Sequence, residues 1–374
     1  MREARENVAG PLLLAGFEGT TPSPEIRELI RERRLGGVIL YGKNCVDAGQ
    51  VLELTNALQA EAKAAGAGEP LLVAIDQEQG RVVRIREGVT LFPPMGEIAR
   101  VGTPLLIERI SRAVSRELVA LGVNWNLAPV ADVLSTPSCP VGTRSFGTDP
   151  AVVSAFACAW VRGAGKEGMV SCVKHFPGHG GTEKDSHFTS PRIDRSMEEL
   201  ETVDLPPFRA AIASGAPAVM TTHITFPALD PDLPATFSPA VIDGLLRKEL
   251  GFDGVVVSDD LEMAGSAENF SLSEGALRAL GAGVDLVLVS GMLLPERDIP
   301  GLLDDLARAV VTGETPRARI DEALRRVRLV KQRSRAGTWE RSRKEADDLL
   351  RCREHLALLR VVEERLNKEV GDAL

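Results

Sequence analysis

The densest group of residues with possible chemistry lies between positions 171 and 187. The chain has five histidines, and three of them, His175, His179 and His187, fall in this stretch. A short apolar run precedes Lys174, and a Pro-Gly pair follows it closely, as expected where a buried strand ends in a surface loop. The residue types therefore predict a site at the exit of this strand.

Asp185 and His187 add a spacing that suits proton transfer. Two residues at i and i+2 place their side chains on one side of an extended backbone. A carboxylate there can accept one ring N–H, which sets the tautomer and raises the basicity of the other nitrogen. Such a histidine can act as a general acid or base. An isolated Asp-x-His is more often an ordinary polar loop, so the neighbouring residues decide its meaning.

The complete string, KHFPGHG-x-T-x-x-D-S-H beginning at Lys174, resembles a known signature. It is similar to that of family 3 glycoside hydrolases, in the branch of β-N-acetylglucosaminidases that remove terminal β-linked N-acetylglucosamine. The resemblance implies that His187 is the proton donor and Asp185 its orienting partner, on a mobile loop. It also implies that Lys174 and His175 hold the sugar.

Two other strings resemble motifs of the same family that bind the substrate. The string from Asp76 to Arg84 is close to D-x-E-G-G-R-V-x-R, whose first Asp and last Arg bind sugar hydroxyls. Gln79 replaces a family glycine there, so the resemblance does not predict the backbone turn at this position. The string around Arg144 resembles G-x-R-S-F-G and implies a substrate-binding arginine. Without the resemblance, such charged clusters are more often ion-paired surface loops.

A further string resembles the family's S-D-D-L-x-M, and this resemblance implies that Asp259 is the nucleophile. An aspartate after a strand can instead cap the next helix, and that reading suits Asp260 better. His223 follows another strand and is as readily a satisfied rim residue as a direct substrate contact. Asn126 and Asp132, in a string similar to N-x-A-P-V-x-D-V, are expected to shape the rim of the fold.

Eight apolar runs alternate with helical patterns along the chain. They lie at 12–15, 37–41, 71–75, 123–129, 169–173, 218–222, 255–257 and 285–290. This alternation predicts an α/β protein with a parallel sheet, and eight strands predict a closed (β/α)8 TIM-like barrel. Asp76, Lys174, His175, His223 and Asp259 all follow strands, at the carboxyl ends where barrel active sites form.

The barrel is expected over 1–335, followed by a charged helical extension over 336–374. Apolar residues recur there at steps of three and four and form one stripe. They are Leu349, Cys352, Leu356, Leu359, Val362 and Leu366. The stripe predicts docking on the chain's own barrel and hence a monomer. A dimer formed through this helix is the alternative.

Composition excludes other classes of protein. The net charge of −9 and the lack of a basic run argue against nucleic-acid binding. No segment approaches the ~20 apolar residues of a membrane span. The five cysteines are scattered and lack C-x-x-C spacing, which predicts a reduced, cytoplasmic protein without a zinc site. No metal or cofactor is expected.

The resemblance implies a retaining, exo-acting β-N-acetylglucosaminidase that acts on oligosaccharides containing N-acetylglucosamine, such as muropeptide fragments of peptidoglycan. A phosphorylase of the same family is an alternative, because a histidine acid does not repel phosphate. A metal-dependent hydrolase on the same barrel is a second alternative, although the chain has no histidine before His175. A non-catalytic sugar-binding barrel would not need both Asp259 and His187.

Overall fold

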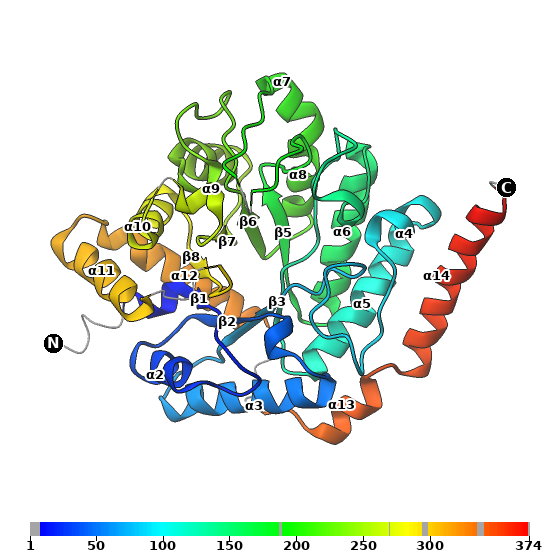
Figure 1. The fold of residues 1–374 in the computed structure, drawn as a ribbon, viewed down its shortest axis with the longest axis horizontal. Coiled ribbons are helices and arrows are strands. Elements are labelled where there is room, and N and C mark those ends of the chain that lie inside the picture. Colours follow the sequence, from blue (N-terminus) through cyan, green and yellow to red (C-terminus); the bar gives the residue numbers. More distant parts are fainter. Residues whose placement is uncertain (1–7, 187–188, 269, 294–297, 335–339, 373–374) are drawn as a thin grey trace.

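A computed structural model describes residues 8–186, 189–268, 270–293, 298–334 and 340–372 of the protein. Eight parallel strands pair in sequence order, and the last strand closes on the first to form a barrel surrounded by helices (Figure 1). The predicted (β/α)8 fold is therefore confirmed. The strands are β1 Leu13–Ala15, β2 Gly37–Leu40, β3 Leu72–Ile75, β4 Trp125–Asn126, β5 Val170–Phe176, β6 Ala218–Thr221, β7 Val255–Asp260 and β8 Leu286–Val289.

The helices that follow the strands make the outer layer. The longer ones are α2 Pro24–Glu32, α3 Ala48–Ala64, α5 Pro104–Ala120, α6 Pro150–Lys166, α8 Leu205–Ala213, η6 Ala240–Glu249, α10 Leu272–Ala282, α11 Ile299–Thr312, α12 Arg317–Arg333 and α14 Arg353–Asp372. The shorter ones are η1 Gly10–Leu12, η2 Gly42–Asn44, α4 Met95–Val101, η3 Gly142–Arg144, α7 Met197–Glu199, η4 Leu200–Asp204, η5 Ala235–Phe237, α9 Ala264–Ala267 and α13 Arg343–Leu349. No helix in the described ranges is long and apolar enough to cross a membrane.

Apolar side chains from alternate strand positions fill the barrel interior. Leu14, Ile39 and Trp125 belong to this inner cluster and are fully buried. Val327 and Val330 of α12 join the same cluster. Because α12 also contacts η1, which precedes β1, it covers the amino-terminal end of the barrel. The opposite, carboxyl-terminal end is left for a site.

Three strands differ clearly in length from the expectation, and one of them is β7, which runs over Val255–Asp260 rather than 255–257. The run at 123–129 forms only the two residues of β4, because the Ala128 N–H turns back to the Asn126 carbonyl at 2.8 Å instead of bonding a neighbouring strand. β5 runs further than 169–173 and includes Lys174 and His175. The Lys174 N–H donates to the Pro129 carbonyl at 3.1 Å, which extends the pairing of β5 toward the rim. The strand thus carries both side chains directly into the site.

The carboxyl-terminal extension docks on the barrel's own helices through a buried polar centre. Glu117 of α5 is 2% exposed and accepts hydrogen bonds from the Thr90 hydroxyl (2.7 Å), the Arg351 N–H (2.9 Å) and His355 Nδ1 (2.7 Å). Val362 of the predicted stripe is fully buried against α4 and α5. Docking on the same chain is confirmed. The boundary at 335/336 falls outside the described residues and stays a prediction.

Candidate active site

Six of the predicted residues line one cavity at the carboxyl ends of the strands. The cavity has a volume of about 270 Å³. The six residues are Asp76, Arg84, Arg144, Lys174, His175 and Asp259. They come from the loop after β3, from η3, from β5 and from β7. The barrel therefore brings together groups that lie far apart in the sequence.

A buried network of ion pairs forms one wall of this cavity. Lys174 Nζ contacts Asp76 Oδ1 and Glu78 Oε1, each at 2.7 Å. Arg144 binds both oxygens of Glu78, at 2.7 and 2.8 Å, and Arg84 contacts Asp76 at 3.2 Å. Burial alone would raise the pKa of the Glu78 carboxyl, yet the charges of Arg144 and Lys174 lower it. The wall thus presents ionised groups that can form charge-assisted hydrogen bonds with sugar hydroxyls.

His175 is oriented from behind by Asp132. Its Nδ1 lies 2.8 Å from Asp132 Oδ2, and its backbone N–H donates to Oδ1 at 3.1 Å. Asp132 is fully buried; burial would raise the pKa of its carboxyl, but the nearby His175 lowers it to about 2. This arrangement leaves Nε2 of His175 toward the cavity, 3.4 Å from Arg144. The expected role of Asp132 in shaping the rim is confirmed.

Asn126 plays the corresponding part for the exit of β3. Its side-chain amide exchanges two hydrogen bonds with the Gln77 backbone: Oδ1 accepts at 3.1 Å and Nδ2 donates at 3.2 Å. Gln77 directly follows Asp76. Asn126 therefore holds the backbone from which Asp76 enters the cavity, as expected of a rim residue.

The loop that follows β5 packs closely on the barrel rim. A Cβ added at Gly180 would lie 1.9 Å from the Val133 carbonyl oxygen, so only glycine fits there. His179 Nε2 contacts the Ser186 hydroxyl at 3.1 Å. Asp185, which precedes Ser186, is half-buried and is not among the residues that line the cavity. His187 lies outside the described residues, so its role as the acid stays a prediction.

Asp259 and Asp260 end β7 and differ in environment. Asp259 is half-buried and lines the cavity, and its Oδ1 accepts the N–H of Asp260 at 2.9 Å. Asp260 Oδ1 accepts the N–H groups of Glu262 (3.1 Å) and Ser290 (3.2 Å), which joins the end of β7 to that of β8. The reading of Asp260 as a helix cap is wrong, because the next helix, α9, starts only at Ala264.

His223 lies behind this pair of aspartates. It is fully buried, and its Nε2 donates to the Asp260 carbonyl at 2.9 Å. Its ring stacks on Phe237, with centroids 5.7 Å apart. His223 is not among the residues that line the cavity. This placement favours the rim role over the direct substrate contact, which stays a prediction.

Sequence reasoning missed several residues that line the cavity. Glu78 stands within the motif that supplied Asp76, and Tyr41 directly follows β2, so the positions of both could have been recognised. Asp260, which the sequence favoured as a helix cap, also lines the cavity. The others are apolar: Val82, Leu127, Met220, Met263, Leu288, Met292 and Leu293. Sequence gives no signal for most of them, because an apolar residue near a strand end is normally part of the core.

Gln79 adopts a left-handed backbone conformation that favours glycine, with φ of 80°. Its Oε1 accepts the Phe92 N–H at 2.9 Å, which offsets the strain. We expect Gln79→Gly to change the free energy of unfolding by less than about 1 kcal/mol, because it removes strain and hydrogen bond together. Gln79→Ala keeps the strain and loses the bond, so it should destabilise by about 1–2 kcal/mol. Urea unfolding of both variants tests this; equal losses would contradict it.

Asp260 should make stability depend on pH. Burial raises the pKa of its carboxyl to about 7, despite the hydrogen bond from Ser290. The folded protein then binds a proton more tightly than the unfolded chain, so this group lowers stability as pH rises from about 4 to 7. Asp260→Asn should therefore stabilise the protein at pH 8, by up to about 4 kcal/mol, and much less at pH 4. A gain that is equal at both pH values would contradict the shift.

The comparisons with known proteins agree with this geometry. A family model, the glycosyl hydrolase family 3 N terminal domain, matches residues 7–330. The chain is 43% identical over 286 residues to a beta-hexosaminidase of Alkalilimnicola ehrlichii, covering 75% of this chain and 80% of that protein. It is 37% identical over 332 residues to beta-hexosaminidase A of Pseudoalteromonas piscicida, covering 83% of this chain but 56% of that protein.

A solved structure gives the same result. The chain superposes with a TM-score of 0.91 on a family 3 β-N-acetylglucosaminidase from Paenibacillus sp., at 40% identity. The match covers 96% of this chain and 68% of that one. The chain therefore belongs to glycosyl hydrolase family 3, in the branch that contains the β-N-acetylhexosaminidases.

Proposed function

We propose that this protein hydrolyses terminal β-linked N-acetylglucosamine from oligosaccharides and retains the β configuration. The observation that carries the proposal is the position of Asp259, whose carboxylate lines the same cavity as the ionised wall of Asp76, Arg84 and Lys174. Such a wall can hold the hydroxyls of one sugar ring while the carboxylate faces its anomeric carbon. The names of the relatives support the hexosamine.

In the proposed reaction Asp259 attacks the anomeric carbon and forms a covalent glycosyl-enzyme. His187 protonates the leaving oxygen and then takes a proton from the incoming water, while Asp185 stabilises its imidazolium form. Two displacements at one carbon give net retention. Because burial raises the pKa of Asp260 to about 7, this carboxyl repels a negative charge on Asp259 less than a fully ionised neighbour would.

The apolar side of the cavity suits the rest of the substrate. Met220, Met263 and Met292 line the cavity together with Leu127 and Leu288. Methionine side chains adapt to irregular apolar surfaces. We assign to this side the C–H face of the pyranose and the methyl of the 2-acetamido group. Muropeptide fragments in the cytoplasm are the proposed natural substrate, which rests on the resemblance of the loop between Lys174 and His187.

A panel of 4-nitrophenyl β-glycosides that differ only at carbon 2 tests the function. We expect kcat/KM for the 2-acetamido sugar to exceed that for the 2-hydroxy sugar by at least about tenfold, because a matched pocket gains 1–3 kcal/mol from such groups. The panel is run in phosphate and in a phosphate-free buffer. Free sugar should form in both, whereas a sugar phosphate would show a phosphorylase. No turnover of any glycoside would contradict the proposal.

A further inference from the structure

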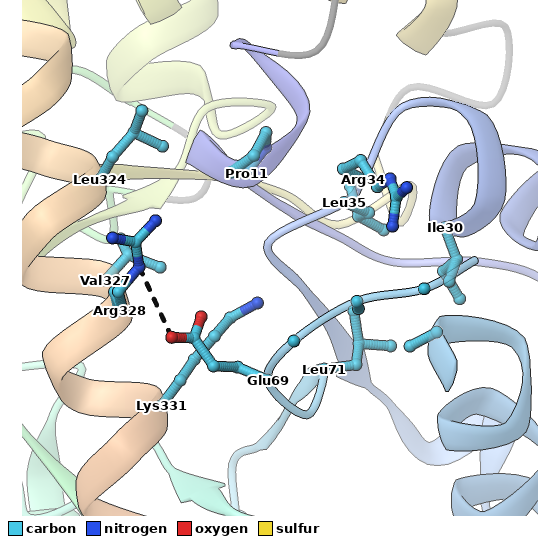
Figure 2. A pocket seen from close by; sticks show the side chains of 14 residues that line it. Pro11, Ile30, Arg34, Leu35, Glu69, Leu71, Leu324, Val327, Arg328 and Lys331 are labelled. Atoms are coloured by element: carbon cyan, nitrogen blue, oxygen red, sulfur yellow. Dashed lines mark ion pairs between the residues drawn. The ribbon is translucent and has the colours of Figure 1, made fainter. Parts of the chain in front are cut away.

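A second and larger cavity lies at the other end of the barrel. It has a volume of about 370 Å³ and sits where α2 and α3 end and α12 passes across, before β1 to β3 begin (Figure 2). Its lining includes Pro11 and Leu71, which precede β1 and β3. The proposed active site is at the carboxyl ends of the strands. The two cavities therefore share no lining residue and can be tested separately.

Positive charge exceeds negative charge in this second cavity. Arg34, Arg328 and Lys331 line it, against the single carboxylate of Glu69. That carboxylate is already shared, because its Oε1 lies 3.5 Å from Arg328 Nε and accepts a hydrogen bond from Gln332 Nε2 at 3.2 Å. A net positive hollow attracts an anion.

Lys331 is the group that most needs such an anion. Figure 2 shows its side chain extending from α12 toward the centre of the cavity, beside Glu69. Within the ranges that the structure describes, no carboxylate lies within 4.0 Å of its Nζ. Burial lowers the pKa of Lys331 to about 8, and the charge of Glu69 only partly opposes this. A negatively charged partner would stabilise the charged form of an ammonium group in such surroundings.

The rest of the lining is apolar. Leu35, Leu71 and Val327 are almost fully buried, whereas Pro11, Ala67 and Leu324 are only partly buried. A small inorganic anion would leave the exposed parts of Pro11, Ala67 and Leu324 in contact with water. An anion that also carries an apolar chain would cover them, and burying each CH₂ group is favourable.

We propose that this cavity is a binding site for a carboxylate that carries an apolar chain, with the carboxylate held by Lys331 and Arg34 and the chain lying against Pro11, Ala67 and Leu324. The site is independent of the proposed hydrolase activity. Groups that face the lysine are Glu69 from the loop before β3, Arg34 from the turn after α2, and Arg328 on its own helix.

Isothermal titration calorimetry of the full chain with octanoate tests the proposal. We expect octanoate to bind at one saturable site. Acetate and inorganic phosphate lack the apolar chain and 1-octanol lacks the carboxylate, so each should bind at least about tenfold more weakly. Affinity should fall about tenfold from pH 7 to pH 9, because Lys331 with a pKa of about 8 must take up a proton to bind the anion. Equal binding of 1-octanol, or no saturable binding of octanoate, would overturn the proposal.

Variants locate the site. Lys331→Met should weaken octanoate at least about tenfold, whereas Lys331→Arg should stay within about threefold. Lys248→Met, which removes an exposed lysine of η6, is the matched control and should change nothing. If Lys331→Met melts before the titration, Arg34→Ala, at an exposed position, should still weaken binding. Unchanged affinity in a folded Lys331→Met or Arg34→Ala protein would overturn the assignment. Asp259→Asn should bind octanoate normally, which separates this site from the proposed active site.

Discussion

The Asp259→Gly variant should lose at least about a thousandfold in kcat, because the covalent step has no nucleophile without this carboxylate. Binding of N-acetylglucosamine should weaken little, since Asp76, Arg84 and Lys174 form the wall that holds the ring. Turnover is measured with the 4-nitrophenyl substrate and product binding by calorimetry. Retention of more than a tenth of the wild-type rate would reject Asp259 as the nucleophile.

Adding azide to the Asp259→Gly variant tests which face of the sugar Asp259 occupies. The space left by Asp259→Gly can admit azide, which would attack the anomeric carbon from the side of the missing carboxylate and give the α-glycosyl azide. Asp243→Gly, at an exposed position paired with Lys248, is the matched control and should keep its rate and form no azide product. A β-glycosyl azide from the Asp259 variant would place the nucleophile on the other face of the sugar.

The second large effect is expected for Lys174→Met. The ammonium group contacts both Asp76 and Glu78, and the side chain is only 3% exposed. Removing it leaves two buried carboxylates without their shared partner, which typically costs about 3–5 kcal/mol. We expect the free energy of unfolding to fall by that amount and kcat/KM to fall at least about a hundredfold, because the wall loses its geometry.

Lys248→Met is the control for this variant. Lys248 pairs with Asp243 at 2.7 Å, but both side chains are more than half exposed. Such surface pairs contribute about 0–1 kcal/mol. Urea unfolding should therefore separate the two variants clearly. A loss of less than about 1 kcal/mol in Lys174→Met would show that the network is not a stabilising unit.

The sequence predicted the fold well because each element signals itself locally. Three consecutive valines at 255–257 mark a strand buried on both faces, and β7 begins at the first of them. Proline and capping residues mark helix starts, as with Ser23 before α2. Local signals do not show where the backbone hydrogen bonds between two neighbouring strands end. The short length of β4 was therefore not predicted.

The site was predicted in part for the same reason. Motifs placed Asp76 and Asp259 at strand exits and Arg144 on a separate Gly-flanked loop, and the barrel then brought them to one cavity. The contact of Lys174 with Asp76 joins residues 98 positions apart, and no spacing in the sequence reveals it. For His223 the sequence could not decide between two roles. A histidine that follows a strand can face a cavity or, as here, donate to a backbone carbonyl such as that of Asp260, and the sequence looks the same in both cases.

The most direct test of the proposed mechanism is mass spectrometry of the enzyme after reaction with a 5-fluoro-N-acetylglucosaminyl fluoride. A retaining enzyme with a carboxylate nucleophile accumulates the glycosyl-enzyme when its second step is slowed. We predict a stable adduct of one sugar on the peptide that contains Asp259. An adduct on a different carboxylate, or turnover through the substrate's own acetamido group with no adduct, would contradict the account.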